Sequence, residues 1–177
     1  MAKVTTGGDF TEYLVPTPNA FLPGIGSGIV AGPDGNLWFT ENGANKVAKV
    51  TTSGVITEYR PPTPGSFSQS IAAGPDGNLW FTENGGTKVA KVTTSGVFTE
   101  YPTPDDSEPV AIAAVYGSLW VTENLPNQLA EVTTSGVFTE HTIPTSGSGP
   151  SFGIAAGPDG NLWLTIDNLV VKFGVVP

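Results

Sequence analysis

The stretch "AGPDGNLWFTEN" stands at 31–42 and recurs unchanged at 73–84. It returns as "AGPDGNLWLTI" at 156–166 and, with more changes, as "AVYGSLWVTEN" at 114–124. Self-similarity at a fixed period is the sequence signature of repeat architectures. The tryptophans keep the same period, with separations of 42, 40 and 43 residues. One repeat of about 42 residues therefore fills the chain.

The repeat can be followed from end to end as four successive units. We place these units at 2–47, 48–89, 90–129 and 130–177. Because each unit is too small to bury a core alone, we expect all four to belong to one domain, 1–177.

Within one unit we expect four strands and no helix, as the second unit illustrates. The small-residue strand "SIAAG" (70–74) enters the turn "GPDG", in which Pro75 suits the first central position. The strands "NLWFTE" (78–83), "KVAKVT" (88–93) and "VFTEY" (97–101) follow, each separated from the next by a turn. Apolar residues never recur at helical spacing for more than one turn.

Four antiparallel strands in about 42 residues describe one blade of a β-propeller, so we predict an all-β propeller. The inner strands are rich in Gly and Ala, which suits crowding around an axis, and the tryptophans are expected to fill the space between blades. The four tryptophans are Trp38, Trp80, Trp120 and Trp163.

The third-strand motif occurs five times, because "NLVVKF" (168–173) matches "NKVAKV" (45–50). The chain thus begins with the third and fourth strands of one blade and ends with the first three of another. These staggered ends predict about four blades per chain with a composite closing blade. One chain then makes a closed four-bladed monomer, whereas two chains make an eight-bladed homodimer, which we favour.

The composition of the chain limits the classes of molecule that we expect it to bind. The net charge is −9 with only seven Lys and Arg, so we expect neither nucleic acid nor an anionic membrane as a partner. The absence of cysteine excludes disulfides and thiolate chemistry. The opening "MAKVTTGGDF" has no apolar core, so we expect no signal peptide in this soluble chain, and no compartment is indicated.

The unit "IAAGPDGNLWFTEN … KVAKVTTSGVFTEYPTP" resembles the repeat of the virginiamycin B lyase (streptogramin B lyase) family, over essentially the whole chain. The resemblance implies a propeller with seven blades in one chain. A chain with about four is then a fragment, a self-assembling half or a short relative. The resemblance also implies an enzyme that opens a cyclic depsipeptide antibiotic by elimination at an ester, using Mg²⁺ and a general-base histidine.

The family's histidines lie in a Pro-His-Gly-Ile type stretch just before an inner strand. The matching positions in this chain hold no histidine: Ser27, Gln69, Val110 and Phe152. The single histidine, His141, replaces a tyrosine at the end of an outermost strand, and we interpret it as a surface substitution. The scaffold carries over while the catalytic group does not, so we expect no lyase activity.

Carboxylates recur after the tryptophan strands and are the candidate metal ligands: Glu41, Glu83, Glu123 and Asp167. A ring of them at one face can hold a hard cation such as Mg²⁺ or Ca²⁺. The alternative, which we favour, is that each glutamate pairs with Lys46 or Lys88 or accepts turn N–H groups. We therefore expect no cofactor, with Mg²⁺ or Ca²⁺ as the open alternative.

The connections between blades differ in length and character, which is where a repeat scaffold acquires binding sites. The candidate ligand-binding residues in these connections are Phe21, Leu22, Arg60, Phe67, Gln69, Asp105, Asp106 and Phe152. Each can equally be a loop residue that packs on its own blade.

Three functions fit the sequence. The leading one is a non-catalytic, self-assembling β-propeller scaffold that can bind a ligand through the loops of one face. The second is a Mg²⁺-dependent lyase resembling virginiamycin B lyase. The third is a lectin-like or peptide-binding module.

Overall fold

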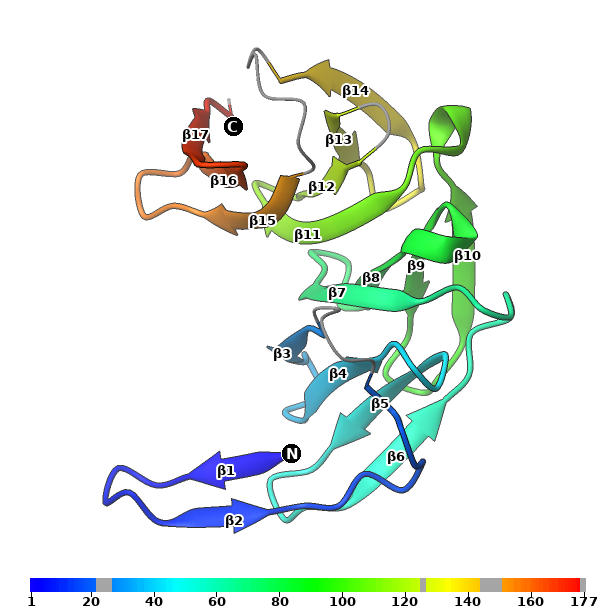
Figure 1. The fold of residues 1–177 in the computed structure, drawn as a ribbon, viewed down its shortest axis with the longest axis vertical. Coiled ribbons are helices and arrows are strands. Elements are labelled where there is room, and N and C mark those ends of the chain that lie inside the picture. The colour runs from blue at the N-terminus through cyan, green and yellow to red at the C-terminus, as the bar shows by residue number, and fades with distance from the viewer. Residues whose placement is uncertain (22–26, 125–126, 144–150, 176–177) are drawn as a thin grey trace.

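The computed structural model describes residues 1–21, 27–124, 127–143 and 151–175, without the side chains of residues 151 and 152. The described residues form antiparallel sheets that follow one another as sectors of an open arc (Figure 1). The only helical segments among them are two short 3-10 turns, η1 (Asn84–Gly86) and η2 (Pro104–Asp106). No helix in this described part is long and apolar enough to cross a membrane.

Three sheets are complete four-stranded blades, and in each the strands follow one another from the inner to the outer edge. The first blade contains β3 (Ile29–Ala31), β4 (Leu37–Glu41), β5 (Lys46–Val50) and β6 (Ile56–Tyr59). The second contains β7 (Ser68–Ala73), β8 (Leu79–Glu83), β9 (Lys88–Val92) and β10 (Phe98–Pro102). The third contains β11 (Pro109–Val115), β12 (Ser118–Glu123), β13 (Gln128–Val132) and β14 (Phe138–Thr142). The predicted blade architecture is confirmed.

The two ends of the chain form incomplete sheets. β1 (Ala2–Val4) and β2 (Phe10–Glu12) make a hairpin, and β15 (Ser151–Ala156), β16 (Leu162–Ile166) and β17 (Leu169–Phe173) make a three-stranded sheet. These are the strands that the staggered repeat predicts. They lie at opposite ends of the arc, so a single chain in this structure does not form the composite closing blade (Figure 1).

The repeat units and the folded blades differ in phase. The predicted unit boundaries at 47/48, 89/90 and 129/130 fall inside β5, β9 and β13, which are the third strands of the complete blades. A sequence period fixes the length of a repeat but not its starting point, whereas the hydrogen-bonded sheet has an inner edge at which each blade begins.

The repeated "GPDGNLW" stretch builds the hairpin between the first and second strands. Gly77 lies at a φ of 74°, a conformation that favours glycine, and closes the turn through its N–H to the Gly74 carbonyl. The Trp80 indole N–H donates to the Asp76 carboxylate at 3.0 Å, and a side chain at Gly74 would overlap the indole. The stretch therefore holds a core tryptophan in place and is scaffold.

The tryptophans fill the core as predicted, with one exception. Trp38 and Trp80 have no exposed surface and Trp120 is 3% exposed, whereas Trp163 in the last sheet is 39% exposed. Trp80 stacks on Tyr101 of the same blade, with ring centroids 5.5 Å apart. A side chain at Gly136 of the third blade would in turn overlap that tyrosine ring, so the rings also fill the interface between blades.

Candidate functional site

The three predicted metal-ligating glutamates lie in the interior, one in each complete blade. Glu41, Glu83 and Glu123 end the second strands, and none of them has exposed surface. In the last sheet Ile166 takes this place, and Asp167 lies exposed in the following turn. Among the described residues no three His, Asp or Glu side chains converge as a group that could hold a metal ion. The structure therefore does not bring the four carboxylates together.

Burial makes these carboxyl groups weak acids. Desolvation, with the Glu58 carboxylate nearby, raises the pKa of Glu41 to about 7. Desolvation likewise raises the pKa of Glu83 to about 7, against the lowering effect of the Ser66 hydroxyl. For Glu123, burial and the adjoining Glu140 carboxyl raise the pKa, although the Ser107 hydroxyl donates to it.

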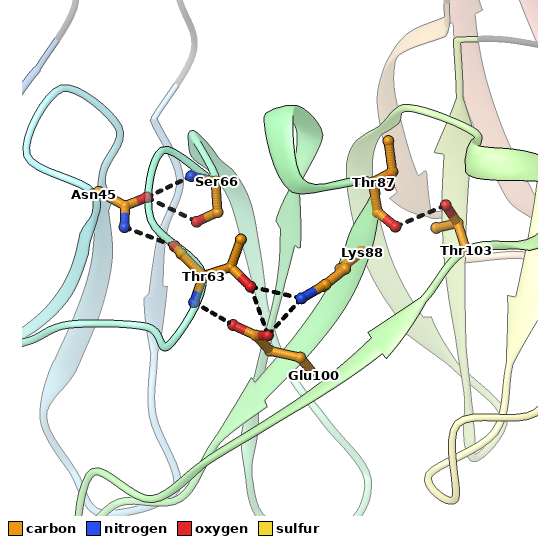
Figure 2. A network of polar contacts seen from close by, with 7 residues as sticks. All are labelled: Asn45, Thr63, Ser66, Thr87, Lys88, Glu100 and Thr103. Carbon is orange, nitrogen blue, oxygen red and sulfur yellow. Dashed lines mark hydrogen bonds and ion pairs between the residues drawn. The ribbon is translucent and has the colours of Figure 1, made fainter.

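The lysines that were expected to pair with the buried glutamates pair instead with glutamates of the fourth strands. Lys88 lies 2.7 Å from the Glu100 carboxylate and 2.6 Å from the Thr63 hydroxyl. Thr63 closes the cluster by donating its N–H and its hydroxyl to Glu100, at 2.9 and 2.7 Å. Figure 2 shows this cluster, which connects the second blade to the loop that precedes it. Lys88, Glu100 and Thr63 thus satisfy one another's hydrogen-bonding groups. Although desolvation acts in the opposite direction, the hydrogen bonds from Lys88 and Thr63 lower the pKa of Glu100.

The first blade repeats this arrangement. Lys46 pairs with Glu58, and Thr17 donates its N–H and hydroxyl to the same carboxylate at 2.9 and 2.8 Å. Sequence analysis missed these fourth-strand glutamates. The signal was present, because "TEY" at 11–13, 57–59 and 99–101 is followed each time within a few residues by "PTP".

The third blade departs from the pattern. Gln128 occupies the lysine position, because it pairs in register with Glu123 as Lys88 does with Glu83. Thr103, the counterpart of Thr63, donates its N–H to the Thr87 carbonyl at 3.0 Å, and its hydroxyl lies 2.7 Å from the Ser107 carbonyl and 3.0 Å from the Thr87 carbonyl, so neither group binds a carboxylate (Figure 2). Among the described residues, no lysine or threonine donates to the Glu140 carboxylate, and its polar neighbour is the carboxyl of Glu123.

The predicted ligand-binding residues are spread over the connections. Phe21 packs on Phe39 with ring centroids 6.3 Å apart, and Phe67 lies against Gly85 of η1. Both therefore pack on their own blades, as the alternative interpretation expects. The other described members of the set are Arg60, Asp105 and Asp106, which are exposed, and Gln69, which is half-buried. Leu22 and the side chain of Phe152 lie outside the described residues.

None of the four positions that the resemblance aligns with the family's histidines holds a histidine. Ser27 is exposed before the first inner strand, and Val110 uses its backbone carbonyl to accept the Thr82 hydroxyl of the neighbouring blade. His141 is not the surface substitution that was predicted. Its ring packs against those of Trp120 and Phe173, with centroids 5.3 and 5.4 Å away, so it replaces tyrosine as a packing group.

The ends of the arc expose apolar surface. An open hollow of about 520 Å³ lies at the N-terminal hairpin and is lined by Met1, Ala2, Glu12, Tyr13 and Leu14. Leu14 is 94% exposed and Phe10 of the same hairpin is 73% exposed. At the other end Trp163, Leu169 and Val170 are 39%, 43% and 68% exposed.

Comparison with known structures identifies close relatives. A streptogramin B lyase is 34% identical over 97% of this chain and 56% of its own, with a TM-score of 0.88. The selenomethionine-substituted virginiamycin B lyase from Staphylococcus aureus is 35% identical over 98% of this chain and 62% of its own, with a TM-score of 0.87. A catalytically inactive form of the Staphylococcus aureus lyase, bound to quinupristin, matches at 34% identity over 97% of this chain and 61% of its own, with a TM-score of 0.84.

This chain therefore spans about 56–62% of the length of these three relatives. No curated protein sequence matches it. The family model for virginiamycin B lyases matches residues 1–165, which is most of the chain. The blades, the repeat and these matches agree that this chain belongs to the virginiamycin B lyase family.

Proposed function

We propose that this chain is a non-catalytic β-propeller scaffold that closes its ring with a second copy. One observation carries the proposal: the tryptophan at the C-terminal end of the arc lacks a tyrosine partner, and the tyrosine at the N-terminal end lacks a tryptophan partner. Among the described residues no tyrosine contacts the ring of Trp163, unlike that of Trp38, which stacks on Tyr59 at 5.5 Å. Tyr13 in turn has no tryptophan from its own chain among the described ring contacts.

The fit can be followed residue by residue. Tyr13 already lies against Gly54 of the first blade, as Tyr59 lies against Gly96 of the second. The hollow beside Tyr13 offers the place for the indole of a partner's Trp163. Lys172 lies over Trp163 at 5.8 Å, as Lys91 lies over Trp80 at 5.1 Å, so β17 has the features of a complete third strand. The last sheet lacks only a fourth strand, and β2 of a second copy supplies it.

The curvature of the arc favours closure of the ring by two chains over closure by one chain. The arc superposes on its relatives over 97–98% of its length, so its rotation from blade to blade is theirs. A seven-bladed ring, which the resemblance implies, needs about 51° per blade, an eight-bladed ring about 45° and a four-bladed ring about 90°. Two copies close after a small relaxation at each interface, whereas one copy alone needs nearly twice the rotation.

The non-catalytic part of the proposal rests on His141, the only histidine of the chain, which packs on Trp120 in place of a tyrosine. A general base needs hydrogen-bond reach to a substrate proton. The exposed side chains of Arg60, Asp105 and Asp106 remain as polar contacts for a ligand at the connecting loops.

Family membership favours a second candidate function, the Mg²⁺-dependent opening of a streptogramin B. Incubation of the chain with a streptogramin B and Mg²⁺, followed by mass spectrometry, distinguishes this lyase function from the non-catalytic scaffold. We expect only the cyclic antibiotic. A linear product that forms in proportion to the protein, and still forms with a His141→Tyr variant, would establish a lyase with a relocated site.

Assembly is tested by sedimentation velocity over a range of concentrations. We expect Tyr13→Ala and Trp163→Ala each to shift the protein towards the monomer. Phe67→Ala is the matched control, because Phe67 is exposed to a similar extent, 43%, but lies in the middle of the arc. Equal sedimentation of all four proteins would refute the proposed contact.

A further inference from the structure

The third blade lacks the half-buried lysine ammonium that the other two complete blades have. In the second blade, Lys88 lies opposite Glu83 in register and its ammonium binds the Glu100 carboxylate. In the third blade the position opposite Glu123 is Gln128, whose side chain is shorter by one bond and carries no charge. The glutamate, Glu140, is retained.

The other donors to this carboxylate are also gone. Thr63 gives Glu100 an N–H and a hydroxyl, whereas the corresponding groups of Thr103 bind the carbonyls of Thr87 and Ser107. The loop between Thr103 and Ser107 is one residue longer than its counterpart between Thr63 and Ser66, and Asp105 and Asp106 both have positive φ. Thr103 is thereby turned away from Glu140.

What remains is a pair of carboxyl groups without a counter-charge. Glu123 has no exposed surface, and its carboxyl contacts the Ser107 hydroxyl and the carboxyl of Glu140. Both oxygens of Glu140 are inaccessible, and no lysine or threonine of the described residues donates to them. Ionising both carboxyls without a counter-charge is strongly unfavourable, so the pair holds either a shared proton or a positive ion.

We propose that the third blade binds a small monovalent cation, ammonium or potassium, between Glu140 and Glu123, at the place that a lysine ammonium occupies in the first and second blades. The ligand class follows from the blades themselves, because the same fourth-strand glutamate holds a single ammonium group in both of them. Oxygen atoms of Glu123, Glu140 and Ser107 are hard ligands that suit such an ion.

The test is thermal unfolding of the full chain near neutral pH in potassium, ammonium or tetramethylammonium chloride at equal ionic strength. Tetramethylammonium is too large for the site and serves as the reference. A bound ion stabilises the folded state by mass action, so we expect the unfolding midpoint to be about 3 °C higher in potassium or ammonium. The site lies within one blade of one chain, so this result does not depend on assembly.

Two variants make the test specific. Gln128→Lys restores the tethered ammonium, so its midpoint is expected to be higher in tetramethylammonium and to lose the cation-specific increase. Lys88→Gln creates the same vacancy in the second blade and is expected to enlarge the increase. If Lys88→Gln does not fold, Lys46→Gln takes its place in the first blade.

Isothermal titration of ammonium chloride into the natural chain and into Gln128→Lys provides a direct reading, with saturable heat expected only for the natural chain. Equal midpoints in all three salts would overturn the proposal and would mean that the two carboxyls share a proton. An increase of the same size in Gln128→Lys would also overturn it, because the salts would then act elsewhere.

Discussion

Replacing Glu83 by Gln should change how the stability of this protein depends on pH. The carboxyl of Glu83 is fully buried, and its pKa rises from 4.5 to about 7 on folding. Between these two pH values the folded chain binds a proton at Glu83 that the unfolded chain has released. The free energy of unfolding therefore falls as the pH rises through this window.

The shift sets the size of the effect. One pKa unit corresponds to about 1.4 kcal/mol, so ionising Glu83 in the folded protein costs roughly 3 kcal/mol. Glutamine keeps the shape of the side chain and removes the ionisation. The difference in free energy of unfolding, Glu83→Gln minus the natural protein, should therefore become more positive by roughly 3 kcal/mol between about pH 4.5 and pH 7.5.

Urea unfolding of both proteins at a series of pH values, at one fixed protein concentration, measures this difference. Glu41 and Glu123 contribute similar slopes to both proteins, and these cancel in the subtraction. A difference that stays constant from pH 4.5 to 7.5 would refute the reasoning, because it would show that Glu83 does not hold a proton in the folded state.

Three further predictions concern packing and closure. Gly136→Ala should lower the free energy of unfolding by about 2 kcal/mol or more in urea, because Gly136 has a φ of 82° and a side chain there overlaps Tyr101. Trp163→Ala should weaken self-association about 1,000-fold in sedimentation equilibrium, because the closed ring holds this aromatic contact twice and each copy is worth about 2 kcal/mol; an unchanged constant would contradict this. Removing residues 1–8 should preserve the dimer, whereas removing residues 167–177 should abolish it, because β17 pairs with β16 over five residues and β1 pairs with β2 over only three. Sizing chromatography measures both variants. A dimer that survives the loss of 167–177 but not the loss of 1–8 would make β1 the third strand of the closing blade.

Much of the fold could be predicted because its signals are local. The turn "GPDG" fixes the first hairpin in three of the four units, and β9 (Lys88–Val92) lies within one residue of the predicted strand. β7 begins at Ser68, two residues before its predicted start. That extension depends on the neighbouring blade, since the Gln69 carbonyl accepts the Gly28 N–H at 2.9 Å. A contact between blades leaves no mark in the sequence of either strand alone.

The polar interior was harder to predict. A glutamate that ends a strand ordinarily indicates an exposed position, and only the folded blade shows that Glu83 is enclosed. The cluster around Glu100 combines Lys88 from the adjacent strand with Thr63 from the preceding connection. Its members are 12 and 37 residues from Glu100, so no motif of contiguous residues marks them. The effect of having Gln128 in place of a lysine can be recognised only once the cluster around Glu100 is known.

The central claim is that two open arcs close into one ring, and the mass of the chain in solution tests it most directly. Light scattering behind a sizing column should give a mass near twice 18.3 kDa. A mass near 18.3 kDa that persists as the protein concentration is raised would contradict the claim, because the exposed Trp163 and the hollow beside Tyr13 would then have no partner in a second copy.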